Sequence, residues 1–172
     1  MKEIIINDSH LTEDEMDDKV IRVKALIFNS KGEILLAHNN NTYQFPGGHK
    51  KSDESIDDSI LREIKEEIGI DLEIKERPFL CISTYDDNYF DTGKKVLNSI
   101  YYYRFLTDLT PNFKETSYDD LELESEFNLF YLKFDEIENF FFFFINKNEI
   151  DKKIAREMLQ VVVEYREIFG GE

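Results

Sequence analysis

Three glutamates near the middle of the chain are spaced so that a helix would gather their carboxylates: Glu63, Glu66 and Glu67. Each helical residue turns the chain by about 100°, so residues three and four apart share one side. Like charges at this spacing repel by roughly 0.2–0.5 kcal/mol per pair. A hard cation such as Mg²⁺ or Mn²⁺ binds carboxylate oxygens and would remove that repulsion. The other interpretation is a solvated helix face balanced by Arg and Lys.

The residues around these glutamates strengthen the first interpretation. Gly47-Gly48 lets the backbone approach another group closely, although an ordinary turn would also use glycine. Arg62 stands next to Glu63, where its guanidinium can orient a carboxylate. A structural salt bridge on the helix surface is the alternative role for Arg62. The residues whose type and spacing together form the pattern are Gly48, Glu54, Arg62, Glu63, Ile64, Glu66, Glu67, Gly69 and Ile70.

This arrangement, from Gly48 to Ile70, resembles the signature of the Nudix hydrolases position for position. The resemblance implies an enzyme that hydrolyses a diphosphate linkage in a nucleotide or a nucleoside-diphosphate derivative. It implies Mg²⁺ as the cofactor, with Mn²⁺ as a substitute. The metal ligands that it implies are Glu63, Glu66, Glu67 and a backbone carbonyl near Gly47.

The resemblance also bears on the residues that assist the reaction, because family members differ in the base that deprotonates the attacking water. Some use a glutamate of the helix, here Glu63 or Glu67. Others use a loop residue, for which Glu124 and Glu126 are the first candidates in the acidic stretch before Phe127. We expect Glu67 to be the base. Arg62 and Glu54 are expected to support the metal ligands.

Several residues outside the helix could contact the substrate. Arg22 on an expected strand could reach a phosphate or a base, and Lys24 shares its face. His49 follows the glycines and could meet phosphate. Tyr43, Phe45 and Tyr85 could stack on a base, but Tyr43 and Phe45 are equally well explained as core aromatics. The family resemblance associates ADP-ribose hydrolysis with a proline that would fall at position 85, where this chain has Tyr85.

The elements that must position these residues follow from hydrophobic periodicity and turn residues. We expect strands over residues 20–29, 33–37, 43–45, 72–85, 96–105 and 127–134. Helices are expected over 54–68, capped by Ser52 or Asp53, and over 148–169, with a short helix beginning at Asp135-Glu136. Residues 1–18 are expected to form an N-terminal arm. This order predicts one domain over residues 1–172, an α/β/α sandwich around a mixed sheet, which is the Nudix-type fold.

Composition limits the partners. A net charge of −16 argues against nucleic-acid polymers, whose binding depends on Lys and Arg. The apolar runs are too short to cross a membrane. The single cysteine, Cys81, fits a reducing compartment, and we expect a cytoplasmic protein. The run Phe140–Phe144 cannot face one core in any regular element. We expect partial burial, and a homodimer is one use for the remainder.

Two other functions remain open. The first is a non-catalytic protein of the same fold that binds a nucleotide and controls a partner, but such a protein would not need all the helix carboxylates. The second is a prenyl-diphosphate isomerase, which shares the fold but needs an additional active-site cysteine. Cys81 lies on an expected strand and is better explained as a core residue.

Overall fold

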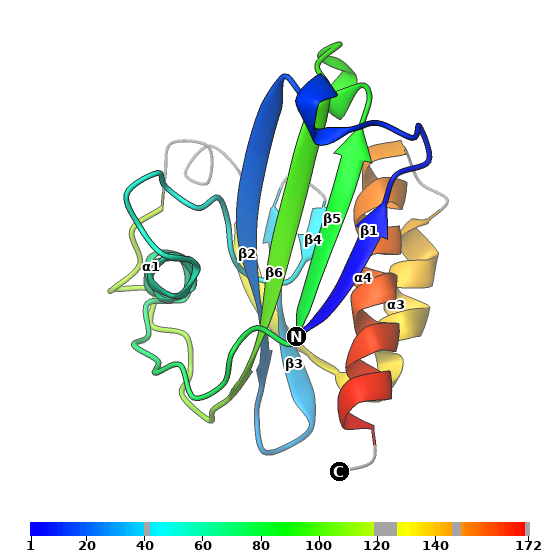
Figure 1. Cartoon of the computed structure of the whole chain (residues 1–172). Coiled ribbons are helices and arrows are strands. Elements are labelled where there is room, and N and C mark those ends of the chain that lie inside the picture. The colour runs from blue at the N-terminus through cyan, green and yellow to red at the C-terminus, as the bar shows by residue number, and fades with distance from the viewer. Residues whose placement is uncertain (40–41, 119–126, 146–148, 171–172) are drawn as a thin grey trace.

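The computed structural model describes residues 1–39, 42–118, 127–145 and 149–170. In this part of the chain, seven strands form one mixed sheet (Figure 1). The path along the sheet is β1-β5-β6-β2-β3-β4, and β7 pairs with β3. The β1–β5 and β2–β6 pairs are parallel, and the other pairs are antiparallel. The strands are β1 (Lys2–Ile6), β2 (Asp18–Phe28), β3 (Glu33–Asn39), β4 (Thr42–Gln44), β5 (Leu80–Asp86), β6 (Val96–Leu106) and β7 (Asn128–Lys133).

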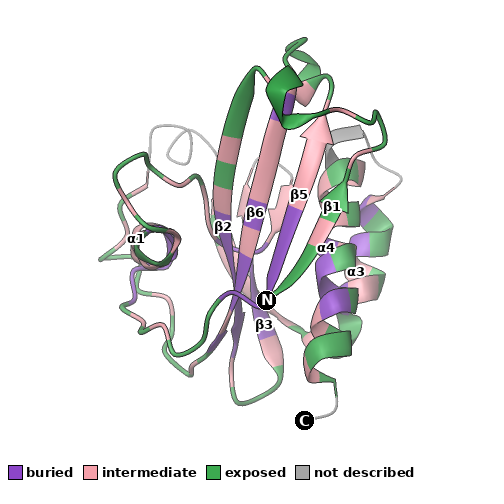
Figure 2. Cartoon of the chain, viewed as in Figure 1, coloured by how far each residue is buried: buried purple, intermediate pink, exposed green. Residues whose placement is uncertain are grey.

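Helices cover both faces of this sheet, as expected for an α/β/α sandwich. Helix α1 (Ile56–Ile68) lies on one side, and α3 (Ile137–Phe144) and α4 (Glu149–Phe169) lie on the other (Figure 1). Each side has its own core, one built around Ile60 and Ile64 of α1 and one around Phe141 and Met158. Figure 2 shows the buried positions along the strands and on α3 and α4, whereas β1 is mainly exposed. The predicted fold class is confirmed.

Helix α1 forms where the apolar stripe predicts it. Ile60, Ile64 and Ile68 are fully buried, and Gly69 ends the helix in the left-handed conformation with φ of 74°. The predicted caps were wrong, because the N-cap is Ser55, whose Oγ accepts the Asp58 N–H at 3.0 Å. Helix α1 therefore begins at Ile56, two residues after Glu54, which leaves that carboxylate available for other contacts.

Two other segments differ from the sequence-based expectations. The expected N-terminal arm begins with β1, which pairs with β5, because its short apolar start can add to the sheet. The expected strand over residues 72–85 begins only at Leu80. Pro78 lacks an N–H for strand pairing, and Leu72 and Ile74 pack against the α1-side core instead.

The phenylalanine run forms α3 and is only partly buried, as predicted. Phe141 and Phe144 are buried, whereas Phe142 and Phe143 are 56% and 65% exposed. The homodimer that the exposed pair could support stays a prediction. Within the described residues, no helix has the length and apolar character needed to cross a bilayer. Cys81 is buried on β5, as expected for a core cysteine.

Candidate active site

A glycine turn runs along the edge of β2 next to α1. The turn pairs with the strand through Val23 N–H to Gly48 O at 3.0 Å and Ala25 N–H to Pro46 O at 2.8 Å. Gly47 has φ of 131°, and a Cβ there would lie 2.1 Å from Val23 O. Only glycine fits this position. The close fit fixes the turn between the strand and the helix.

We call the segment from Gly48 to Ile70 the box, and two of its glutamates on α1 contact this turn. Glu67 Oε2 accepts the Gly47 N–H at 2.8 Å. The Glu63 carboxylate lies beside Gly48, so close that a Cβ on Gly48 would be 2.7 Å from it. Glu63 and Glu67 are buried, whereas the side chain of Glu66 is 34% exposed. The structure thus places Glu67 against Gly47 and Glu63 against Gly48, between the turn and the helix.

Arg62 joins the carboxylates to one another. Its Nη1 donates to Glu63 Oε1 and to Glu66 Oε2, both at 2.8 Å. Its Nε and Nη2 donate to the two oxygens of Glu54 at 2.9 and 2.7 Å. Nη2 also donates to the His49 carbonyl at 3.0 Å, which ties the turn to the helix. Arg62 therefore does more than form one salt bridge on the helix surface, since its guanidinium orients three carboxylates.

The charges in this network perturb one another. The two hydrogen bonds that Arg62 donates to the Glu54 carboxylate, which we call the fork, lower the pKa of Glu54 to about 2, so Glu54 is ionised at neutral pH. The hydrogen bond to Glu54, followed by those to Glu63 and Glu66, raises the pKa of Arg62. Burial removes these groups from water, so their mutual attraction is stronger than at an exposed site. Glu54 and Arg62 are consequently both charged at neutral pH.

The donor chemistry of this cluster fits a hard divalent cation. The cluster holds four carboxylates. Arg62 binds those of Glu54, Glu63 and Glu66, and the Gly47 N–H binds that of Glu67. The Lys51 ammonium lies 3.7 Å from Glu66. Negative charge is therefore in excess, and all the ligand atoms are oxygen, as Mg²⁺ prefers. Among the described residues, no three acidic, histidine or cysteine side chains already form a complete ligand set. Arg62 and the Gly47 N–H hold the carboxylates in the present arrangement.

Replacing Gly48 by alanine should separate metal binding from folding. The three atoms nearest to the added Cβ would all belong to the carboxylate end of Glu63, a flexible group that can move. We expect Gly48→Ala to fold but to bind Mn²⁺ about 10-fold more weakly, measured by isothermal titration calorimetry. Gly32→Ala is the control for a strained backbone without a contact to the site, since φ is 71° there and nothing lies within 4 Å of its Cβ position. Wild-type affinity in Gly48→Ala would contradict a role for Glu63 in binding the cation.

Two expected substrate contacts lie together beside the turn. Arg22 Nε donates to His49 Nε2 at 3.2 Å, and Arg22 and His49 form an isolated antiparallel bridge. His49 is exposed and Arg22 is partly exposed. Because Arg62 binds the His49 carbonyl, these side chains sit directly next to the carboxylate network.

The three aromatic candidates are scattered. Phe45 is fully buried in the core on the α3 and α4 side, which supports its interpretation as a core aromatic. Tyr43 is half-buried, stacks on His38 at 4.4 Å and contacts Phe144. Tyr85 pairs with Leu97 and, by strand alternation, lies on the opposite face of the sheet from Arg22. Glu124 and Glu126 lie outside the described residues.

Lys24 is a buried cation behind the turn, and sequence reasoning gave it no role of its own. Its Nζ donates to Gln44 Oε1 at 2.7 Å and to Phe45 O at 3.4 Å. Burial lowers the pKa of Lys24 to about 8. A lysine inside the apolar run VIRVKALIF was the available signal. Its contacts hold the segment that leads from β4 into the glycine turn.

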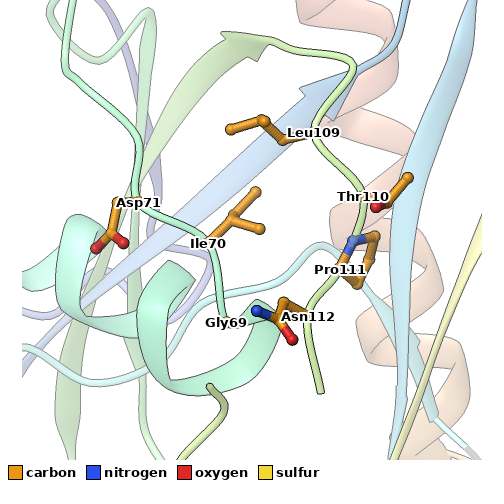
Figure 3. A pocket seen from close by; sticks show the side chains of 7 residues that line it. All are labelled: Gly69, Ile70, Asp71, Leu109, Thr110, Pro111 and Asn112. Carbon is orange, nitrogen blue, oxygen red and sulfur yellow. The ribbon is translucent and has the colours of Figure 1, made fainter. Parts of the chain in front are cut away.

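A shallow, open pocket of about 510 Å³ lies at the C-terminal end of α1 (Figure 3). It is lined by Gly69, Ile70, Asp71, Leu109, Thr110, Pro111 and Asn112. None of the box carboxylates lines it, and so the candidate chemistry belongs to the glycine turn and not to this pocket.

Comparison with known proteins decides the family, since the family model for the NUDIX domain matches residues 18–158. This chain belongs to the Nudix family. An RNA pyrophosphohydrolase from Marinomonas sp. (strain MWYL1) is 41% identical over 51 residues. The match spans 28% of this chain and 32% of that protein, so the chain matches about a third of the length of its curated relative.

Solved structures with this Nudix fold are similar over most of the chain. A NUDIX hydrolase from Nitrosomonas europaea has a TM-score of 0.58 at 17% identity, covering 86% of this chain and 88% of that one. A MutT structure from work on Aliivibrio salmonicida and Vibrio cholerae has a TM-score of 0.50 at 22% identity, covering 82% and 96%. At these identities the likeness shows the fold.

Proposed function

We propose that this Nudix protein is a Mg²⁺-dependent hydrolase of a diphosphate linkage in a nucleotide or nucleoside-diphosphate derivative. The observation that carries the proposal is the contact of Glu63 and Glu67 with the Gly47-Gly48 turn, linked to Glu66 through Arg62. It gathers oxygen donors with excess negative charge beside a backbone that a ligand can approach. Glu63, Glu66, Glu67 and the Gly47 carbonyl are the proposed metal ligands.

The chemistry consists of adding water across one P–O–P linkage. The water oxygen forms a bond to phosphorus, and the bridging oxygen leaves with its electron pair on the other phosphate. When bound, a divalent cation offsets the negative charge that develops on the phosphate oxygens. We assign Glu67 as the base that takes the proton from water, because its contact with Gly47 directs its carboxylate to the turn. Arg62 keeps Glu63 and Glu66 in place.

The substrate would reach this turn from the side of Arg22 and His49. Both side chains carry donors, and both are at least partly exposed beside the carboxylate network. They are suited to contact phosphate or a base of the substrate. The strongly acidic surface favours a small nucleotide over a polymer. A reducing, cytoplasmic location is part of the same proposal.

A screen for phosphate and pyrophosphate release tests the proposal. Nucleoside triphosphates, nucleotide sugars, ADP-ribose, dinucleoside polyphosphates and an RNA with a 5′-triphosphate would be compared with Mg²⁺ and with excess chelator. We expect turnover of at least one small nucleotide that requires the metal. Undiminished turnover in chelator would refute the metal assignment. Nucleotide binding without turnover across the screen would instead favour the non-catalytic sensor.

A further inference from the structure

A segment far from the box in sequence closes the end of α1. The last four carbonyls of an α-helix have no partner within the helix. Here the Gly69 N–H donates to Lys65 O at 3.0 Å. The other three carbonyls are bonded by residues Asn112–Tyr118, which we call the strap. Asn112 N–H donates to Ile68 O at 2.9 Å, Ser117 N–H to Glu66 O at 2.9 Å, and the Tyr118 hydroxyl to Glu67 O at 3.5 Å.

The strap is itself a folded turn, so its donors are held in place. Glu115 N–H donates to Asn112 O at 2.9 Å, and Thr116 Oγ1 donates to Phe113 O at 3.1 Å. The strap also lies tightly against the helix end. A Cβ on Gly69 would be 2.0 Å from Asn112 O, and Figure 3 shows Asn112 beside Gly69. Gly69 therefore has a second role besides ending the helix, since it makes room for the strap.

The carbonyls that the strap binds belong to the residues that carry the metal-site carboxylates. Helix ends open more readily than helix centres, and Glu66 and Glu67 lie in the last turn. If that turn opened, their carboxylates would lose their positions relative to Gly47 and Arg62. Most of the strap is exposed, including Asn112 and Ser117, so its contribution to the apolar core is small. The strap therefore affects the structure mainly through its hydrogen bonds to the end of α1.

We propose that the strap positions Glu66 and Glu67 for metal binding by holding the last turn of α1 closed. Asn112, Ser117 and Tyr118 are positioning residues in this scheme, and none of them touches the cation or the substrate. The inference rests on the proposed function, because it takes these carboxylates as the metal ligands. It adds that the metal affinity of the box depends on a segment outside it.

Two glycines with the same positive φ provide a matched test. Gly69 and Gly93 both have φ of 74°, but nothing lies within 4 Å of the Cβ position of Gly93. Gly69→Ala adds a clash with Asn112 to the strain that both variants share. We expect Gly69→Ala to bind Mn²⁺ at least about 10-fold more weakly and Gly93→Ala to bind it as wild type does. Calorimetry on the full chain measures the affinity, and hydrogen exchange of residues 65–68 reports the opening of the turn.

A gentler variant keeps the proposal testable if Gly69→Ala does not fold. Tyr118→Phe retains the ring that packs against Phe127 at 5.0 Å but loses the hydroxyl donor. Its Mn²⁺ affinity should fall about two- to fivefold with an unchanged melting temperature. Wild-type affinity in Tyr118→Phe, or in a Gly69→Ala protein whose last turn exchanges faster, would overturn the role of the strap. A wild-type protein that binds no Mn²⁺ would overturn the metal site itself, and the two failures are therefore distinguishable.

Discussion

Glu67→Gln is expected to lower kcat at least about 100-fold while the protein remains folded. The amide oxygen of glutamine can still accept the Gly47 N–H that now binds Glu67 Oε2 at 2.8 Å. The turn should keep its place, and the free energy of unfolding should change by about 1 kcal/mol or less. The substitution removes the negative charge and the ability to accept a proton. Either loss should lower kcat by a large factor at a metal-assisted hydrolytic site.

Two measurements separate the roles of Glu67. A pure base would lose kcat and keep its Mn²⁺ affinity, whereas a metal ligand would lose both. Asp71→Asn is the matched control, because the Asp71 side chain is 85% exposed and its carboxylate pairs with Lys65 at the end of the same helix. This control should retain full activity. A Glu67→Gln enzyme with wild-type kcat would refute both assignments and leave Glu63 and the loop residues Glu124 and Glu126 as the candidates for the base.

The parts of the site that the sequence predicted are those encoded by local periodicity. The isoleucines at 60, 64 and 68 fix which side of α1 faces the core, and this determines where the glutamates point. Gly69 stops the helix because its conformation suits glycine. Gly47 and Gly48 are required by close contacts with Val23 and Glu63. Side-chain type and spacing carried all of this information.

The parts that could not be predicted depend on tertiary contacts without a side-chain signature. The strap binds α1 mainly through the backbone N–H groups of Asn112 and Ser117, which every residue except proline possesses. Tyr85 was an attractive pocket residue, but the register of β5 against β6 decides which face it occupies. Phe45 and Tyr43 alternate with Gln44, and only the packing of α3 showed that Phe45 is core. Ser55 caps α1, and not Ser52 or Asp53. The sequence alone could not choose among them, because all three have side chains that suit an N-cap.

Arg62→Ala is expected to lower the free energy of unfolding by about 3 kcal/mol, because it leaves partly buried carboxylates without their cation. The Arg62 and Glu54 side chains are only 19% and 13% exposed, so water compensates little. Glu54 loses both hydrogen bonds of the fork, and Glu63 and Glu66 lose their shared donor. The loss of orientation should also lower kcat about 10- to 100-fold with saturating Mg²⁺. Urea unfolding and steady-state kinetics measure the two effects.

A double-mutant cycle with Glu54→Gln tests whether the fork causes this effect. The double variant should be more stable than the sum of the single effects predicts, by about 1–3 kcal/mol, since removing Glu54 removes one uncompensated charge. Arg62→Lys should recover part of the stability but little of kcat, because an ammonium cannot form the bidentate contact with Glu54 while bonding Glu63 and Glu66. Arg104→Ala is the control variant, because Arg104 makes a similar two-bond contact with the Glu76 carboxylate outside the network. Its kcat should be unchanged. Strict additivity of Arg62→Ala and Glu54→Gln would mean that the guanidinium supports the site without coupling to Glu54.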